Sequence, residues 1–144
     1  MKSYRFGFDP WGLGLFVLIM LPNVLWMLLA GENDLLMQLS ATPRLDALVS
    51  VCQVLTVAGM VFLCRRDAPP VKPLWPLVWL FAYLLMWVLY GVGVAHPVVF
   101  MGLAVFPCAA MVTFLLQRRN FLTLIPAVLF AAGHIVSSLI RFVL

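Results

Sequence analysis

Charged residues are scarce in this sequence. They make up 10% of its 144 residues, whereas a soluble domain has about 25%. Hydrophobic residues make up 65%, and the mean hydropathy is +1.13. A water-soluble fold of this size would lack the polar residues needed to cover its surface. The composition therefore indicates an integral membrane protein, and the absence of a long polar segment predicts a single domain over residues 1–144.

Cysteine is also rare, and its placement excludes a disulfide framework. The three cysteines lie in or at the end of apolar runs, with no CxxC motif and no histidine at ligand spacing. An odd number of cysteines in apolar surroundings argues against paired disulfides. We expect Cys52, Cys64 and Cys108 to be small packing residues.

The sequence shows no signature of catalysis. It contains no paired carboxylates, no Ser/His/Asp grouping and no cluster of metal ligands, and Asp9 stands alone near one end of the first apolar run. We therefore predict that the protein is not an enzyme and that it uses no cofactor and no metal. The first run is also followed by no A-x-A-like cleavage site, so we expect an uncleaved membrane span and not a signal peptide.

Long apolar runs dominate what is present. A bilayer core of about 30 Å requires about 20 apolar residues in a helix. The runs are continuous and lack strict alternation, which favours helices over barrel strands. Polar or proline-containing segments separate the runs: Gly31–Asp34, Thr42 with Pro43, Arg65–Pro70, His96 with Pro97, and Gln117–Asn120. The sequence thus predicts an all-α bundle of about five transmembrane helices, over residues 11–30, 44–64, 74–94, 98–117 and 121–143.

Basic residues are distributed unequally between the two ends of these spans. The net charge is +4, but the basic residues lie in short clusters beside apolar runs, which indicates orientation signals and no nucleic-acid partner. The positive-inside rule predicts that the N-terminus is inside and the C-terminus outside. Seven basic residues are then inside (Lys2, Arg5, Arg65, Arg66, Lys72, Arg118 and Arg119) and two outside (Arg44 and Arg141).

The fifth run carries a stripe of small and polar residues along one helical face, within about 80° of arc. Such a stripe should face protein or a water-filled cavity, because polar groups are costly in contact with lipid. Close helix packing and a lined cavity are both open interpretations. The stripe consists of Asn120, Thr123, Ala127, Ala131, His134, Ser138 and Arg141.

Polar residues of the first two runs fall in the same outer half of the predicted bundle. In the second run, one helical face carries Thr42, Asp46, Ser50 and Gln53. In the first run, Asn23 directly follows Pro22. We expect Asp46 to pair with Arg141; alternatively, Asp46 only caps its helix and Arg141 extends to lipid phosphates. The candidate polar site is Asn23, Asp46, Ser50, Gln53, His134, Ser138 and Arg141.

The third run is rich in aromatic residues, of which Trp79 and Tyr83 lie deep in the predicted bilayer. They form a candidate aromatic wall for a flat apolar ligand. Packing in the helix core is the alternative interpretation.

Two family resemblances follow from short segments. Phe8–Leu13, Met20–Asn23 and Ser50–Leu55 resemble a family of small, uncharacterised bacterial membrane proteins, which implies a location in the bacterial plasma membrane. Pro76–Trp79, with Tyr83 and Met86, is similar to a motif of the tryptophan-rich sensory (translocator) proteins, which have five helices and bind tetrapyrroles and sterols. That motif has one extra residue here and lies on the third helix instead of the second.

The lipid bilayer is the one partner that these patterns require. For function, they favour binding or transport of a small or lipophilic molecule at the outer-half polar site. The alternative is an accessory or immunity-type protein that docks on another membrane protein. A binding protein should enclose its polar stripes around a cavity, whereas a docking protein should expose them or place them at an interface, either of a homo-oligomer or with another membrane protein.

Overall fold

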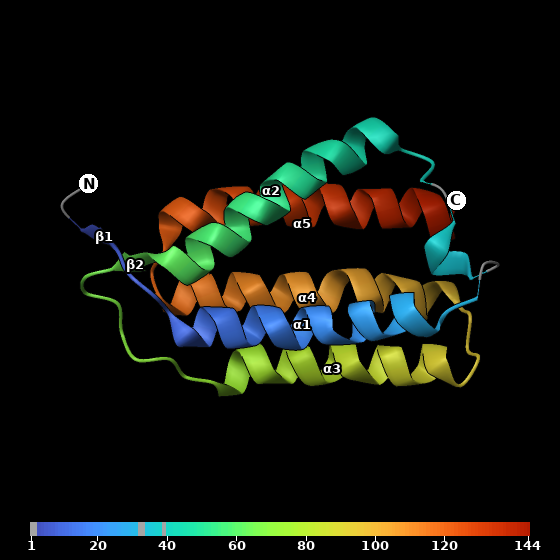
Figure 1. Ribbon diagram of the computed structural model, residues 1–144, viewed down its shortest axis with the longest axis horizontal. Coiled ribbons are helices and arrows are strands. Elements are labelled where there is room, and N and C mark those ends of the chain that lie inside the picture. Colours follow the sequence, from blue (N-terminus) through green and yellow to red (C-terminus); the bar gives the residue numbers. More distant parts are fainter. Residues whose placement is uncertain (1–2, 32–33, 39) are drawn as a thin grey trace.

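The computed structural model describes residues 3–31, 34–38 and 40–144, and its described residues contain five long helices (Figure 1). Each helix is long and apolar enough to cross a membrane, and the predicted all-α class with five long helices is confirmed. Lys2, Glu32 and Asn33, which belong to the predicted charge pattern and first boundary, lie outside the described residues. The helices are α1 (Pro10–Leu29), α2 (Pro43–Phe62), α3 (Leu74–Gly91), α4 (Pro97–Gln117) and α5 (Phe121–Phe142).

Local chemistry explains where several helices begin and end. Proline is the first residue of α1, α2 and α4, a position where its missing N–H leaves no hydrogen bond unmade. The Asp9 carboxylate caps α1 by accepting from the backbone N–H groups of Trp11 and Gly12. The α3 helix ends at Gly91, earlier than the predicted 94, and Gly93 then turns the chain with a φ of +92°.

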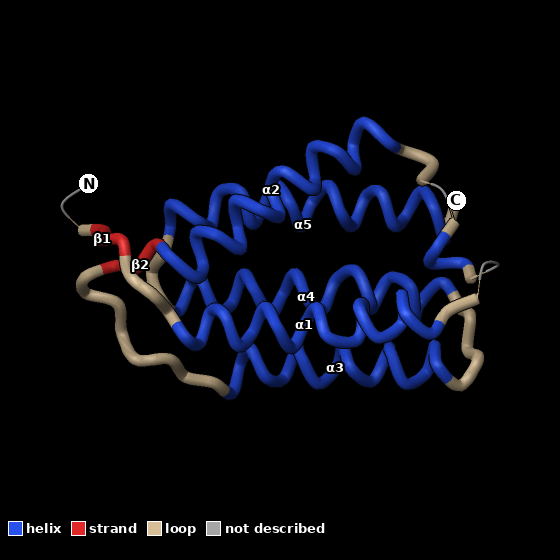
Figure 2. The backbone as a smooth tube through the Cα atoms, in the orientation of Figure 1, coloured by secondary structure: helices blue, strands red, loops and turns tan. Residues whose placement is uncertain are grey.

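A two-stranded sheet closes one end of the bundle (Figure 2). Strand β1 (Tyr4–Phe6) pairs antiparallel with β2 (Leu63–Arg65), so the chain leaves the helical conformation slightly before the predicted end of the second span. The sequence analysis did not predict this sheet, because each strand is three residues long and its partner is far away in the chain.

The helices form two layers (Figure 1). One layer is the pair α2 and α5; the other contains α1, α3 and α4, with α4 packed against both α3 and α5. Helices α1 and α2 meet near the end that carries the β-strands, where Gly12 lies against the Met60 carbonyl. Toward the opposite end α2 diverges from α1, so the two layers separate there (Figure 1).

Glycines allow α2 and α5 to approach closely. A Cβ atom added to Gly59 would lie 2.6 Å from Cγ2 of Thr123, and one added to Gly133 would lie 2.5 Å from Cγ2 of Val49. Both distances are shorter than real Cβ contacts, so a larger residue would push the helices apart. At Thr123, near the start of α5, the stripe therefore serves close packing against α2.

An ion pair joins the N-terminal segment to the α4–α5 turn. Oδ2 of Asp9, which is 5% exposed, lies 2.8 Å from Nη2 and 2.9 Å from Nε of Arg118. The same guanidinium donates through Nη1 to the Pro69 carbonyl at 2.8 Å. The expectation that Asp9 stands alone is wrong, because the fold brings the distant Arg118 beside it.

The described basic residues separate between the two ends of the bundle as the sequence analysis expected. Those of one group lie at the end with the β-strands, and Arg44 and Arg141 lie at the opposite end, near the C-terminus (Figure 1). The three cysteines are free and buried, as expected for packing residues. The first group is Arg5, Arg65, Arg66, Lys72, Arg118 and Arg119.

Candidate binding cavity

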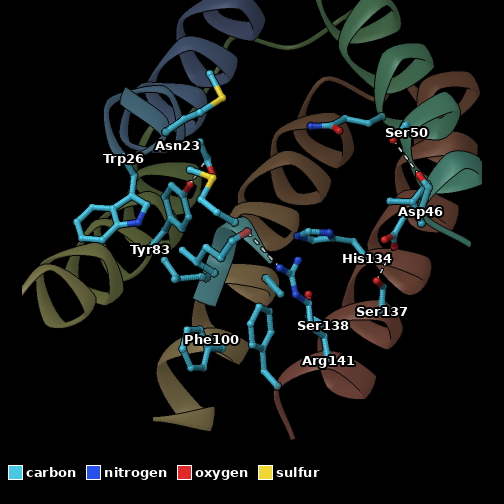
Figure 3. Close-up of a pocket in the computed structure, with 18 of the residues that line it drawn as sticks. Asn23, Trp26, Asp46, Ser50, Tyr83, Phe100, His134, Ser137, Ser138 and Arg141 are labelled. Atoms are coloured by element: carbon cyan, nitrogen blue, oxygen red, sulfur yellow. Dashed lines mark hydrogen bonds between the residues drawn. The ribbon is translucent and has the colours of Figure 1, made fainter. Parts of the chain in front are cut away.

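A cavity of about 410 Å³ lies in the half of the bundle where the two layers separate. All five helices contribute to its lining, together with a short 3₁₀ helix, η1 (Leu35–Met37). The structure brings every residue of the candidate polar site to this one cavity (Figure 3). They are Asn23, Asp46, Ser50, Gln53, His134, Ser138 and Arg141.

The polar residues of α2 and α5 form one wall of the cavity, which we call the polar wall. Asp46 and Gln53 are seven residues apart on α2, and His134 and Arg141 are seven apart on α5. At 1.5 Å per residue, each helix presents polar groups over about 10 Å. The polar wall thus extends from the end of the bundle toward its middle.

Asp46 is the centre of a hydroxyl cluster. Its carboxylate accepts hydrogen bonds from Ser137 at 2.5 Å, from Thr42 at 3.4 Å and from Ser40. The hydroxyls of Thr42 and Ser137 also lie 3.1 Å apart, although Thr42 makes no capping bond to the first turn of its own helix. These neutral donors stabilise the carboxylate and fasten the start of α2 to the end of α5.

Ser137 was missing from the candidate site. It lies about 80° around α5 from the centre of the predicted stripe and outside its edge, so periodicity alone gave no reason to select it. Ser137 is 9% exposed and faces the start of α2. The signal that would have found it is the antiparallel packing of α2 on α5, which places Asp46 beside this turn.

The expected ion pair between Asp46 and Arg141 does not form. Nη2 of Arg141 instead donates to the backbone carbonyls of Leu35 at 3.1 Å, Leu36 at 3.2 Å and Gln38. The η1 segment folds back toward the C-terminal end of α5. Backbone carbonyls of this segment therefore bind the Arg141 guanidinium in place of the Asp46 carboxylate. Arg141 therefore neither pairs with Asp46 nor is left free for lipid phosphates, because its guanidinium binds backbone carbonyls of the same protein.

The η1 segment is held on a second side by α3. The hydroxyl of Tyr90 donates to both carboxylate oxygens of Asp34, at 3.0 and 3.1 Å. Leu36 and Met37 of this segment contribute side chains to the cavity lining. Tyr90 and Arg141 thus position η1 against the end of the cavity.

Aromatic side chains line the side opposite the polar wall, and we call this side the aromatic wall. Trp26 of α1, Trp87 of α3 and Phe100 of α4 belong to it, and Figure 3 shows Trp26 and Tyr83 across the cavity from Asp46. The ring centroids of Trp26 and Trp87 are 5.8 Å apart. Trp87 was not among the predicted residues of the wall, although it follows Tyr83 by one helical turn.

Tyr83 borders the cavity as predicted, whereas Trp79 does not. Tyr83 is 1% exposed, and its hydroxyl donates to the Ile19 carbonyl at 3.0 Å and accepts from Nδ2 of Asn23 at 2.6 Å. Trp79 instead stacks on Phe106, with centroids 6.2 Å apart, and is not part of the cavity lining. Its inclusion in the aromatic wall was wrong, because the wall continues toward the C-terminal end of α3.

His134 projects from α5 into the cavity with its ring stacked on Phe130, at 5.3 Å between centroids (Figure 3). Within the described part of the chain, no group of three histidine, cysteine or carboxylate residues is placed to hold a metal ion. The imidazole nitrogens of His134 can form hydrogen bonds with a molecule in the cavity.

Comparisons with known protein families, curated proteins and solved structures found no match to this chain. The two resemblances described above therefore stay predictions.

Proposed function

We propose that this protein lies in the bacterial plasma membrane and binds or transports a small or lipophilic molecule in the cavity between its two helix layers. One observation carries the proposal: seven polar residues, from three helices and selected by sequence alone, line a single cavity. Its size is typical of cavities that bind small molecules.

The contrast between the two halves of α5 supports a cavity built for an occupant. In the first half, the stripe is closed by packing: Asn120 is 4% exposed and Thr123 is 2% exposed, against Gly59. In the second half the layers separate, and the same stripe lines open space. Polar groups left at membrane depth without protein packing mark pathways or ligand sites in membrane proteins.

The positive-inside rule sets the direction of access in this proposal. With the basic β-strand end inside, the cavity lies in the outer half of the membrane, and its molecule arrives from outside or from the outer leaflet. The docking alternative is less well supported, because the polar faces of α2 and α5 turn toward a cavity within one chain. We propose binding without catalysis.

A cavity-filling substitution tests the proposal. Ser50 lines the cavity, and Val51, the next residue, is 57% exposed on the outer surface of α2. We expect Ser50→Trp to occupy the site, and Val51→Trp to leave it open. Wild-type protein and both variants would be purified from native membranes, and their bound small molecules extracted and identified by mass spectrometry.

The proposal predicts a molecule enriched on wild type and on Val51→Trp but depleted on Ser50→Trp. The variants are compared at equal folded amounts, judged by size-exclusion profile and helical content. Identical extracts from all three proteins would show that the cavity holds no specific molecule, and the proposed function would then be wrong.

A further inference from the structure

We propose that the molecule bound in this cavity is a rigid, flat amphiphile with its polar groups along one edge or face, and not a single-chain lipid. This inference rests on the proposed function, since it names the class of ligand for the same site. It follows from how satisfied and unsatisfied polar groups are distributed over the two walls.

Three side chains of the polar wall lack partners within the described part of the chain. Gln53, His134 and Ser138 all line the cavity, and none of them makes a side-chain hydrogen bond to another described residue. Ser138 is only 8% exposed, so its hydroxyl has little access to anything except the cavity. Gln53 and His134 are half-buried. Polar groups removed from water normally find partners, so an occupant that bonds to these three would remove a free-energy cost.

These three groups are spread along the depth of the cavity. His134 and Ser138 are one turn apart on α5, which is about 6 Å. Val49 packs against Gly133, so Gln53 lies about one turn deeper than His134 on the facing helix. The polar wall thus offers hydrogen bonds at three levels over about 12 Å, from near the end of the bundle toward its middle.

The aromatic wall offers no comparable set of accessible, unpartnered hydrogen-bonding groups. Its polar side chains Asn23 and Tyr83 bond to each other and to the Ile19 carbonyl, so their main hydrogen bonds are already made. The indole N–H groups of Trp26 and Trp87 have no partner in the described structure, but both are buried and therefore present no accessible donor to the cavity. The remaining wall is provided by rings such as Trp26, Trp87 and Phe100. Flat ring faces stack well on such a surface.

The cavity is therefore polar on one side and apolar on the other along its whole depth. A single-chain lipid has the opposite arrangement, with a polar head at one end and an apolar tail along the rest. Its tail would cover the groups at the deeper levels and leave them without partners, at a cost of about 1–3 kcal/mol for each unsatisfied group. A flat body with polar groups along one edge satisfies both walls at once.

A pair of probes with the same ionic group separates the two classes. Cholate carries hydroxyls on one face of a rigid fused-ring body, and laurate is a flexible single chain; both end in a carboxylate. The protein would be reconstituted in lipid nanodiscs, and equilibrium binding of each radiolabelled probe measured below its critical micelle concentration. Binding to empty nanodiscs is subtracted.

We expect cholate to bind saturably to wild type and to Val51→Trp, and not to Ser50→Trp. Gln53→Leu should weaken cholate binding about tenfold, which corresponds to one lost hydrogen bond. Laurate should show only the unsaturable partition seen with empty nanodiscs.

Three other results overturn the inference. If laurate binds saturably in a manner sensitive to Ser50→Trp and cholate does not, the ligand is a single-chain amphiphile, and the proposed function stands. If Ser50→Trp leaves cholate binding unchanged, cholate binds outside the cavity. If neither probe binds saturably, the inference is wrong, and the extraction experiment decides the proposed function separately.

Discussion

Neutralising Asp9 should destabilise the bundle far more than neutralising Asp67, although both carboxylates pair with arginine at the same end of the molecule. Asp9 has a side chain 6% exposed and contacts Nη2 of Arg118 at 2.8 Å. Asp67 has a side chain 57% exposed and contacts Nε of Arg65 at 2.6 Å. The two pairs have similar lengths, so the difference between them is their burial.

The expected magnitudes follow from that difference. Removing one partner of a buried pair leaves the other charge desolvated, which costs about 3–5 kcal/mol. Arg118 is 21% exposed, so we expect about 3 kcal/mol for Asp9→Asn, which keeps an oxygen able to cap α1. Asp9→Ala also loses the cap, which adds about 1 kcal/mol. For Asp67→Asn we expect no measurable change, because water and salt screen an exposed pair.

Reversible unfolding in mixed micelles of increasing dodecyl sulfate content, followed by circular dichroism, measures these differences. The double variant Asp9→Asn with Arg118→Met should recover part of the loss, since no buried charge remains unpaired. Equal destabilisation by Asp9→Asn and Asp67→Asn would refute the reasoning. The Arg65 hydrogen bonds hold the pKa of Asp67 below its ordinary value, so Asp67 is ionised at neutral pH and its substitution by asparagine removes a charge.

Three further predictions follow from the topology and the packing. Cysteine labelling at Ser3 and at the C-terminus, in a chain without native cysteines, should reach the two ends from opposite sides of the membrane, with Ser3 inside; labelling from one side would contradict five spans. Gly59→Val should destabilise the protein by about 1–3 kcal/mol in the same unfolding assay, because its side chain would collide with α5, whereas Gly14→Val should have little effect because the space around Gly14 is open. Exchanging the charges of Asp46 and Arg141 should not restore stability relative to the single reversals, because each binds other partners; a restored double variant would show that the two residues do interact.

The sequence predicted which half of the bundle holds the polar residues and which helix faces carry them, and these two properties placed seven residues at one cavity. Hydrophobic runs define where each residue lies across the bilayer, and helical periodicity defines which residues share a face. Ser50 and Gln53, for example, share the face of α2 that turns inward, while Val51 faces outward. No knowledge of the neighbouring helix is required for either property.

Which inward groups meet could not be predicted in the same way. Asp46 binds Ser137 and not Arg141, because the rotation and register of α2 on α5 bring a different turn opposite the carboxylate. That register depends on Gly59 and Gly133 fitting against side chains of the facing helix, which is a property of the pair of helices. Arg141 lines the cavity as predicted, but its partners belong to the segment between α1 and α2, whose path no periodicity encodes.

Two of the three tryptophans of α3 show that the aromatic wall could not be predicted from periodicity either. Trp79 and Trp87 are eight residues apart, about 12 Å along the helix, and their indole N–H groups are both buried without a hydrogen-bond partner in the described structure. Only Trp87 borders the cavity, because the layers are closed at the level of Trp79 and have separated at the level of Trp87. The divergence of α2 from α1 therefore decides that Trp79 is a packing residue and that Trp87 belongs to the proposed binding site. This divergence cannot be recognised in the sequence pattern of either helix alone.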